Sequence, residues 1–400
     1  MSLPLQGVRV LDLTNVLAGP FCGYQLALMG AEVIKIEMPG TGDLARQLGA
    51  DPELNRRLMG ASFLAQNGGK KSVTLNLKSR RGRDVFLRLV RTADVVLENF
   101  RPGVMDRLGL GYVALRAEKP DLVYCAISGF GQDGPLRDNP AYDQIVQGLS
   151  GVMSVTGDET SAPLRVGYPV CDTVGGITAA FAIASALYGR QVRGTGQYID
   201  VSMLEATLVT LGWVVSNWLI AGVPPKPMGN ENMTASPSGT FRTGDGLLNI
   251  AANKQEQFET LCCLVGRSEL VADPRFAERE ARKKNRYALR DELEKALAAR
   301  SAADWEALFN ANGVPAGRIL SVPEVLEHPQ VRHRDLLQHF AVVPGVDRPV
   351  TVVRGGFKLS DGRPAVSTPP PALGADTESV LREIGYDAAE IARLREEGAI

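Results

Sequence analysis

Short apolar runs alternate with segments of helical periodicity through the first third of the chain. Runs rich in Val, Ile and Leu predict strands at residues 8–13, 32–37, 72–77, 94–98 and 122–127. Helical patterns are found at residues 23–29, 82–91 and 113–118. This alternation is typical of βαβ units. We therefore predict an α/β fold whose large domain contains a Rossmann-like parallel sheet.

The second half of the chain predicts a smaller domain. A helix at 174–188, a strand at 197–201 and a long helix at 204–223 precede a proline-rich linker. A strand pair, 239–242 and 247–251, then leads into a charged, helix-rich stretch. An extended segment at 338–353 and a helix at 388–397 close the chain. We predict a large domain over 1–223, a linker at 224–228, a small α+β domain over 229–322, and a segment, 323–400, that returns to the large domain.

Composition places the chain among ordinary globular proteins. Of its 400 residues, 44% are hydrophobic and 22% are charged, and Lys plus Arg (44) nearly balances Asp plus Glu (45). A net charge of −1 gives no general attraction for nucleic acid or for an anionic membrane, so neither partner is expected. The apolar segment 204–223 contains Glu205, Asn217 and two tryptophans, which favours a buried or dimer-facing helix over a membrane span.

Cysteine and histidine usage narrows the chemistry. The five cysteines lie in apolar stretches without metal-ligand spacing, and the N-terminus shows no export signal. We therefore expect a cytoplasmic protein with no metal. The three histidines fall between residues 328 and 339, which argues against a Ser/His/Asp or zinc site. The first βα turn, 14–20, lacks the spaced glycines of a dinucleotide fingerprint, so a nicotinamide enzyme is not expected.

Asp172 is the most informative acid, because it precedes a helix rich in Gly and Ala. One interpretation is structural: aspartate is a favoured N-cap, which accepts hydrogen bonds from the first N–H groups of a helix. The other is catalytic: a carboxylate held at a helix start can attack an electrophilic carbonyl. The two roles are compatible in one residue, and the residues alone leave both open.

The chain resembles the class III CoA transferases, a family that includes formyl-CoA transferase, carnitine CoA-transferase and α-methylacyl-CoA racemase. The resemblance covers essentially the whole length and is carried by residues 5–13, 30–37, 99–103, 128–131 and 167–177. It implies that Asp172 is the nucleophile, which forms an acyl anhydride and then an aspartyl-CoA thioester. It also implies an interlocked homodimer and a loop, matching 228–239 here, that closes over the intermediate.

The same resemblance implies a set of residues that bind coenzyme A: Leu17, Ala18, Leu75, Asn76, Leu77, Lys78, Asn99, Phe100, Arg101, Arg107 and Tyr142. The charged members are also compatible with ordinary solvated surface positions. Leu17 and Met38 replace a glutamine and an adenine-stacking arginine of oxalate-using formyl-CoA transferases, which makes oxalate a less expected acceptor.

Tyr142 stands where the racemase branch has its proton-shuttling histidine, and a phenol is a poor two-way shuttle at neutral pH. We therefore predict a CoA transferase that moves CoA from a short acyl-CoA, such as succinyl-CoA, to a free acid, and we expect that acid to be a dicarboxylate. A racemase-like isomerase and a non-catalytic CoA-binding protein are the alternatives.

Overall fold

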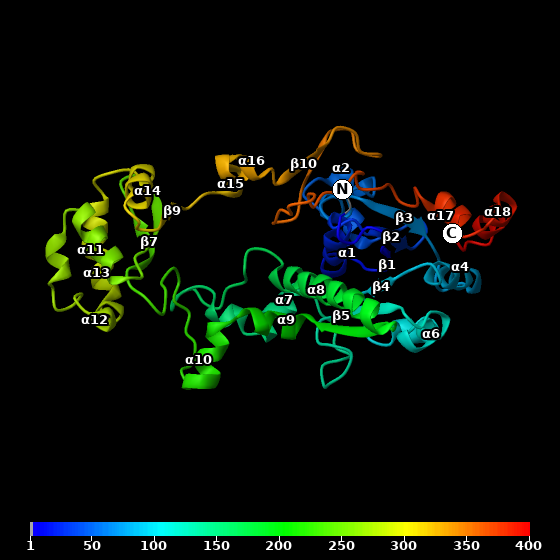
Figure 1. Ribbon diagram of the computed structural model, residues 1–400, viewed down its shortest axis with the longest axis horizontal. Coiled ribbons are helices and arrows are strands. Elements are labelled where there is room, and N and C mark those ends of the chain that lie inside the picture. Colours follow the sequence, from blue (N-terminus) through cyan, green and yellow to red (C-terminus); the bar gives the residue numbers. More distant parts are fainter. Residues whose placement is uncertain (1–2) are drawn as a thin grey trace. The chain divides into compact units, whose positions relative to one another are not determined.

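The computed structural model describes residues 3–400 and divides them into two compact units (Figure 1). Unit 1 contains residues 3–152, 165–223 and 334–400. Unit 2 contains residues 153–164 and 224–333. The chain thus passes from one unit to the other at the proline-rich segment that starts at Pro224. Nothing in the sequence pattern had marked residues 153–164 as part of the second unit.

Unit 1 is built on a six-stranded parallel sheet, which confirms the predicted α/β fold. The strands, in the spatial order β3-β2-β1-β4-β5-β6, are β3 (Lys70–Thr74), β2 (Glu32–Glu37), β1 (Arg9–Asp12), β4 (Val95–Glu98), β5 (Val123–Ser128) and β6 (Gln197–Ser202). Val10 of β1 is paired with Val33 on one side and with Val95 on the other. The strand order therefore reverses between β1 and β4, as in a Rossmann fold, and ligands of such sheets bind outside the carboxyl ends of the strands at that point.

Helices cover both faces of this sheet. The helices of unit 1 are α1 (Ala18–Leu28), α2 (Pro52–Arg56), α3 (Ala61–Leu64), α4 (Arg80–Val90), α5 (Val104–Arg107), α6 (Tyr112–Glu118), α7 (Asp143–Leu149), α8 (Val170–Arg193), α9 (Met203–Thr210), α10 (Trp213–Ala221), α17 (Thr377–Glu383) and α18 (Ala388–Glu396). One core packs α1 and α8 on the sheet, and a second packs α4, α6, α17 and α18 on the opposite face (Figure 1). Because both faces are covered, the central strands β4 and β5 are buried at every position instead of at every second one.

Two elements differ from the sequence prediction in where they end. The long helix expected at 204–223 is two helices, α9 and α10, bent by 79°. Gly212 lies at the break with φ 52° and ψ −118°, a conformation that residues with a side chain avoid. Strand β3 ends at Thr74 instead of Leu77, because Asn76 leaves the sheet and donates its backbone N–H to the carbonyl of Ala399, 2.8 Å away.

The C-terminal part of unit 1 also contains a hairpin of β10 (Leu337–Phe340) and β11 (Val350–Val353), within the segment expected to be extended. The Tyr24 hydroxyl donates to the Val353 carbonyl at 2.8 Å, which ties the hairpin to α1. Helix α8 has the length and apolar content of a membrane span, but several of its small residues lie in the core that packs on α1.

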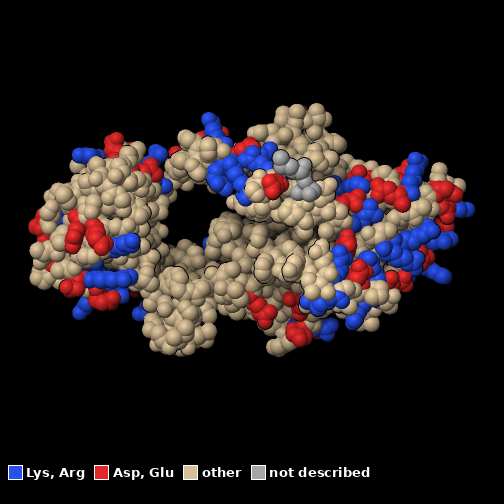
Figure 2. Space-filling view, viewed as in Figure 1, with Lys and Arg blue, Asp and Glu red and all other residues tan. Residues whose placement is uncertain are grey.

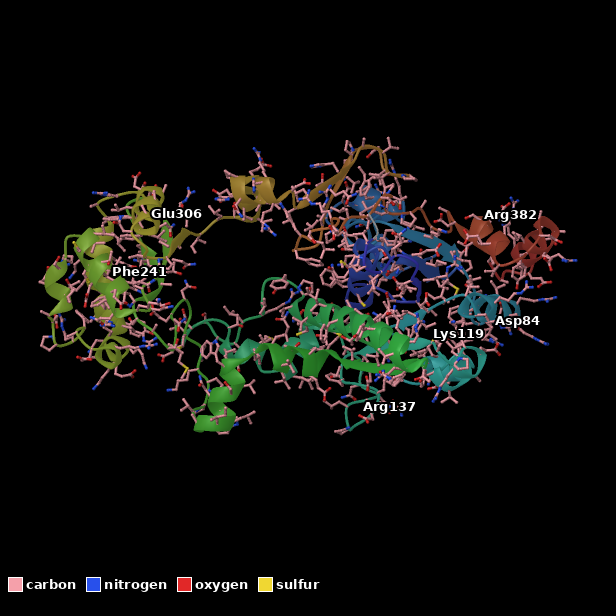
Figure 3. All side chains as sticks on the ribbon, in the orientation of Figure 1. Asp84, Lys119, Arg137, Phe241, Glu306 and Arg382 are labelled. Atoms are coloured by element: carbon pink, nitrogen blue, oxygen red, sulfur yellow. The ribbon has the colours of Figure 1, made fainter. Side chains whose placement is uncertain are left out.

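Unit 2 is an α+β arrangement around its own core. Its antiparallel sheet has the order β7 (Ser238–Arg242), β8 (Leu247–Ala251), β9 (Ala316–Arg318). Its helices are α11 (Gln255–Leu264), α12 (Arg279–Lys284), α13 (Arg286–Leu297), α14 (Ala302–Ala311) and α15 (Val322–Glu327), and α16 (Pro329–Arg334) lies at the boundary with unit 1. Phe241 of β7 is buried in this core, whereas Glu306 on α14 pairs with Arg318 of β9 at 2.7 Å (Figure 3).

Candidate functional site

A cavity of about 290 Å³ opens at the carboxyl ends of β1, β4 and β5, where the strand order reverses. It is lined by Asn15, Val16, Leu17, Ala18, Asn99, Phe100, Arg101, Ile127, Ser128, Gly129, Pro140, Ala141, Tyr142, Asp172 and Met203. All of these residues belong to unit 1. The position is the one that the topology of an open parallel sheet favours for a ligand.

Asp172 lies in the first turn of α8, but it is not the residue that caps the helix. Helix α8 begins at Val170, and the carboxylate of Asp143, on α7, accepts the N–H groups of Cys171 at 2.8 Å and of Asp172 at 3.3 Å. The N-cap interpretation of Asp172 is therefore wrong. The capping acid comes from another helix, 29 residues earlier in the chain, and local sequence pattern does not reveal such a pair.

The side chain of Asp172 is partly buried in the cavity wall and has no stabilising donor. Within residues 3–400, no hydrogen bond to its carboxylate is found, and its own backbone N–H donates to the Asp143 carboxylate. Burial, and secondly the negative charge of Asp143, raise the pKa of Asp172 from 3.8 to about 7. A carboxylate with this pKa is more basic, and hence more nucleophilic, than an exposed aspartate.

Small residues in the next turn of α8 bring Asp172 to the start of α1. Gly176 follows Asp172 by four residues, so the two lie on the same face of the helix. A Cβ placed on Gly176 would lie 2.4 Å from the carbonyl oxygen of Ala18. Only glycine permits this close approach, which is why Leu17, Ala18 and Asp172 share one cavity wall.

The loop between β1 and α1, which contains Leu17, lines the cavity and is held in a strained conformation. Val16 has φ 67°, which is rare for a β-branched residue. Its N–H donates to the Asp43 carboxylate at 2.9 Å. The Asn99 side chain accepts the N–H of Asn15 and donates to the Asn15 carbonyl, both at 2.8 Å. Asn99 therefore clamps this loop to the end of β4.

We expect Asn99→Ala to release the loop. Amide hydrogen exchange of residues 15–17 should accelerate about fivefold to tenfold, because losing this bridge removes roughly 1 kcal/mol of local stability. The matched control is Asn310→Ala in unit 2, since Asn310 makes the same two-way bridge to the backbone of Ala316 at 2.9 and 3.1 Å. That variant should accelerate exchange near residue 316 only. Unchanged exchange at residues 15–17 in Asn99→Ala would contradict the clamp.

Four buried charged residues, Lys35, Asp43, Glu37 and Arg46, hold the same loop in place through hydrogen bonds and ion pairs. Lys35, fully buried, lies 2.9 Å from the Asp43 carboxylate and donates to the Thr14 carbonyl at 2.8 Å. The Asp43 N–H in turn donates to Glu37 at 3.0 Å, and Glu37 is bound by the buried Arg46. The wall formed by residues 14–18 is thus connected by hydrogen bonds to the carboxyl end of β2.

Glu98 shapes the turn that carries Asn99. Its carboxylate accepts the N–H of Phe100 at 2.8 Å and the hydroxyl of Tyr124 at 3.3 Å. Burial raises the pKa of Glu98 to about 7 in spite of these two donors. The residues that sequence reasoning missed are Asp43, Glu98 and Asp143. Each is an acid whose partners are recognisable only once the backbone is folded.

The structure brings together seven of the residues singled out by the sequence: Asp172, Leu17, Ala18, Asn99, Phe100, Arg101 and Tyr142 line the cavity. It does not place Leu75, Asn76, Leu77, Lys78 or Arg107 in that lining. Leu75 and Leu77 are buried, Lys78 and Arg107 are exposed, and the segment lies beyond β3, the edge strand of the sheet. The five cysteines are free, and residues 3–400 contain no cluster of three metal-ligating side chains.

The arrangement has components of nucleophilic acyl transfer: an unbonded carboxylate with a raised pKa, a lining that mixes apolar and polar residues, and one cationic side chain, Arg101, in that lining. It contains no neighbouring histidine or cysteine pair that would support triad chemistry among the described residues.

Comparison with known proteins identifies the family of the chain. The profile of CoA-transferase family III matches residues 5–377. Acetyl-CoA:oxalate CoA-transferase of Acetobacter aceti is 44% identical over 335 residues, which is 84% of this chain and 85% of the relative. Succinate–glutarate CoA-transferase of Agrobacterium fabrum is 38% identical over 392 residues, which is 95% of this chain and 96% of the relative.

A solved structure is similar over almost the full length. The crystal structure of a CAIB/BAIF family protein from Brucella suis superposes with a TM-score of 0.83 at 34% identity, covering 96% of this chain and 100% of that protein. The sequence profile, the full-length relatives and the shared fold lead to one conclusion: the chain belongs to CoA-transferase family III, whose enzymes transfer CoA between an acyl-CoA and an acid.

Proposed function

We propose that Asp172 carries the CoA transfer covalently. An oxygen of its carboxylate attacks the thioester carbonyl of the donor, and the C–S bond breaks. CoA departs as the thiolate, and the donor acyl group and Asp172 now form a mixed anhydride. The thiolate then attacks the aspartyl carbonyl carbon, and the anhydride C–O bond breaks. The donor acid departs as a carboxylate, and Asp172 is now joined to CoA as a thioester. An acceptor carboxylate repeats these steps in reverse order and regenerates Asp172, with no net gain or loss of protons.

The observation that carries this proposal is the state of the Asp172 carboxylate. It lies in a cavity at the switch point of the sheet, and no donor in residues 3–400 stabilises its charge. The apolar neighbours Val16, Leu17 and Met203 favour exclusion of water, which would hydrolyse both intermediates. Incubation of the protein with succinyl-CoA and hydroxylamine should give a hydroxamate on Asp172, detected by peptide mass spectrometry. Absence of any adduct during measurable exchange would contradict the covalent route.

The cavity holds the reacting end of the substrate and not the whole coenzyme. Its volume, about 290 Å³, lies at the lower limit of small-molecule sites. We propose that Asn99, Phe100, Arg101 and Tyr142 contact the acyl and thiol end of CoA. The segment 75–78 and Arg107 remain proposed contacts for the more distant phosphates, which cations bind through charge-assisted hydrogen bonds.

For the acids, we propose a short dicarboxylate as acceptor and succinyl-CoA as donor. The names of the two relatives above contain the dicarboxylates oxalate and glutarate. A panel of oxalate, glutarate, mesaconate and citramalate, with butyrate as the monocarboxylate control, tests this choice when the acyl-CoA products are separated by mass. Exchange with butyrate alone would contradict it. Deuterium entering the α-position of a 2-methylacyl-CoA without any acceptor would indicate the racemase alternative.

We also propose that the active form is a homodimer, interlocked as the resemblance implies. Helix α10 has no buried residue, and Trp213, Trp218, Leu219 and Ile220 are each more than half exposed. Figure 2 shows the surface of this helix without charged side chains. Isolated exposed apolar residues are common, but a continuous patch of this kind is typical of an interface. A second copy of the chain is the occupant that accounts for it.

Ile220→Asp should therefore shift the protein from dimer to monomer. Ile220 is 86% exposed in the single chain, and a charge buried in a dimer interface costs several kcal/mol. Size-exclusion chromatography with light scattering measures the change. Val113→Asp is the control, because Val113 on α6 is 83% exposed but is not part of the α10 patch. A monomeric wild-type protein, or a dimer that both variants leave intact, would contradict the proposed interface. The cytoplasmic location stays a prediction.

A further inference from the structure

Asp143 occupies the head of the helix that carries the proposed nucleophile. It is only 6% exposed, and its Oδ1 accepts the N–H groups of Cys171 and Asp172. Its Oδ2 accepts the Gln147 side chain at 2.6 Å, and an Arg165 guanidinium nitrogen lies 3.8 Å away. Gln147, itself fully buried, is fixed by the N–H of Val166 at 2.9 Å.

The amides at the start of α8 are consequently all satisfied. Val170 donates to the carbonyl of Tyr168 at 2.8 Å, and Thr173 donates to that of Pro169 at 3.0 Å, while the two amides between them bind Asp143. The N-terminus of a 24-residue helix carries roughly half a positive charge, which would stabilise an adjacent carboxylate. Here a second carboxylate takes up that stabilisation.

We propose that Asp143 is a positioning residue for the transfer reaction: by accepting the two amides at the start of α8, it leaves the Asp172 carboxylate unbonded in the cavity. The inference rests on the proposed function, because a basic carboxylate matters only if Asp172 is the nucleophile. An aspartate that capped its own helix would be a weaker nucleophile, since its lone pairs would be shared with N–H donors.

Other ionisable groups around Asp172 come from each neighbouring segment. They are Asp143 and Tyr142 at α7, Cys171 on α8, Arg101 in the cavity lining and Arg165 beside Asp143. Helix α9, which packs against α8, carries Glu205 in its first turn. Burial raises the pKa of the Cys171 thiol, so it stays neutral near pH 7. Of the charged groups, Asp143 is the one that acts on the pKa of Asp172.

The stability of the fold reports the state of Asp172 without any need for catalysis. The pKa of Asp172 is about 7 in the folded state and close to 3.8 in the unfolded chain. As the pH rises, the unfolded chain therefore loses this proton at a lower pH than the folded protein does. The folded state is therefore penalised progressively as pH rises from about 4 to about 7, and the penalty is constant above that range. Asp172→Asn removes the penalty. We compare the free energy of unfolding of wild type with that of Asp172→Asn, by calorimetry from pH 4 to pH 9. The difference between the two should stop changing at the folded-state pKa of Asp172. We call this pH the plateau pH.

Asp143→Asn keeps an oxygen acceptor for the two amides but removes the negative charge. In this background we expect the plateau pH to fall by about one unit, the size typical of one nearby like charge. The pH at which adduct formation on Asp172 is half-maximal should fall with it, and the rate at higher pH should drop severalfold. In Asp143→Asn, the new side-chain NH₂ would face the NH₂ of Gln147, and neither group can accept a hydrogen bond. The double variant Asp143→Asn/Gln147→Glu restores this hydrogen bond, because the Glu carboxylate accepts from the new NH₂. The double variant should also lower the plateau pH, although by less.

The matched control is Asp387→Asn, because Asp387 caps α18 by accepting the N–H of Glu390 at 2.8 Å. It loses a comparable cap charge and should leave both the plateau pH and the adduct profile unchanged. An unchanged plateau pH in both Asp143 variants overturns the inference, even if wild-type protein forms the adduct. A wild-type protein that forms no adduct while the plateau pH shifts overturns the proposed function, and leaves the control of Asp172 by Asp143 standing.

Discussion

Asp172→Asn is expected to lower CoA transfer more than about 10³-fold, because an amide oxygen does not form the anhydride and enzymes that lose a covalent nucleophile lose at least this much. The side chains have the same size, and the backbone N–H of residue 172 still binds Asp143, so the cavity should keep its shape. Transfer between succinyl-CoA and labelled acid, followed by product separation, measures the loss. Circular dichroism confirms that the variant is folded.

The matched control is Asp304→Asn, which replaces the aspartate at the third helical position of α14 in unit 2. That side chain is bound to Ser301 at 2.7 Å and is not part of the cavity. Transfer should stay within about twofold of wild type, as is usual for a surface change away from the site. If Asp172→Asn kept substantial activity, both the covalent mechanism and the assignment of the nucleophile would be wrong.

Removal of Arg46 is expected to destabilise unit 1 by about 3 to 5 kcal/mol, because it leaves a buried carboxylate without its cation. Arg46 is fully buried and binds both oxygens of Glu37, at 2.7 and 2.8 Å. Its guanidinium also lies 3.6 Å from the centroid of the Phe63 ring. Burial by itself would raise the pKa of Glu37, but Arg46, Lys35 and Ser72 hold it below the usual value. Arg46→Met should therefore lower the melting temperature of unit 1 by roughly 10 °C in calorimetry.

The control is Arg382→Met, since Arg382 and Glu378 form an exposed pair on α17 (Figure 3). Such pairs contribute about 0.5 kcal/mol or less. Arg46→Met/Glu37→Met, which removes both charges, should recover part of the loss. Equal stability of Arg46→Met and Arg382→Met would show that the buried pair does not support the fold. Because Glu37 also binds Asp43, which holds Val16, we expect Arg46→Met to reduce transfer even below its melting temperature.

The domain that forms the site was largely predictable because its signals are local. Runs rich in Val, Ile and Leu, such as those at 32–37 and 122–127, correspond closely to β2 and β5, and the alternation with helices predicts a parallel sheet. A capping box at Asp387 and Glu390 marks the start of α18. Family resemblance supplied the proposed role of Asp172 and seven of the fifteen residues that line the cavity. Leu17, Ala18 and residues 99–101 sit in short motifs after strands β1 and β4, whereas Tyr142 and Asp172 stand at the starts of helices α7 and α8.

Tertiary structure decided three features that the sequence did not predict. They are the bend at Gly212, the inclusion of residues 153–164 in unit 2, and the capping of α8 by Asp143 instead of Asp172. Tertiary structure also separates residues 75–78 from the cavity, because the strand that precedes them, β3, is at the edge of the sheet. The sequence alone determined which segments are buried, because the pattern of apolar residues is a local property of the chain. It also determined which acidic residue follows each strand. Hydrogen bonds between residues far apart in sequence exist only after folding, and they decide which carboxylate is bound and which one is left to react.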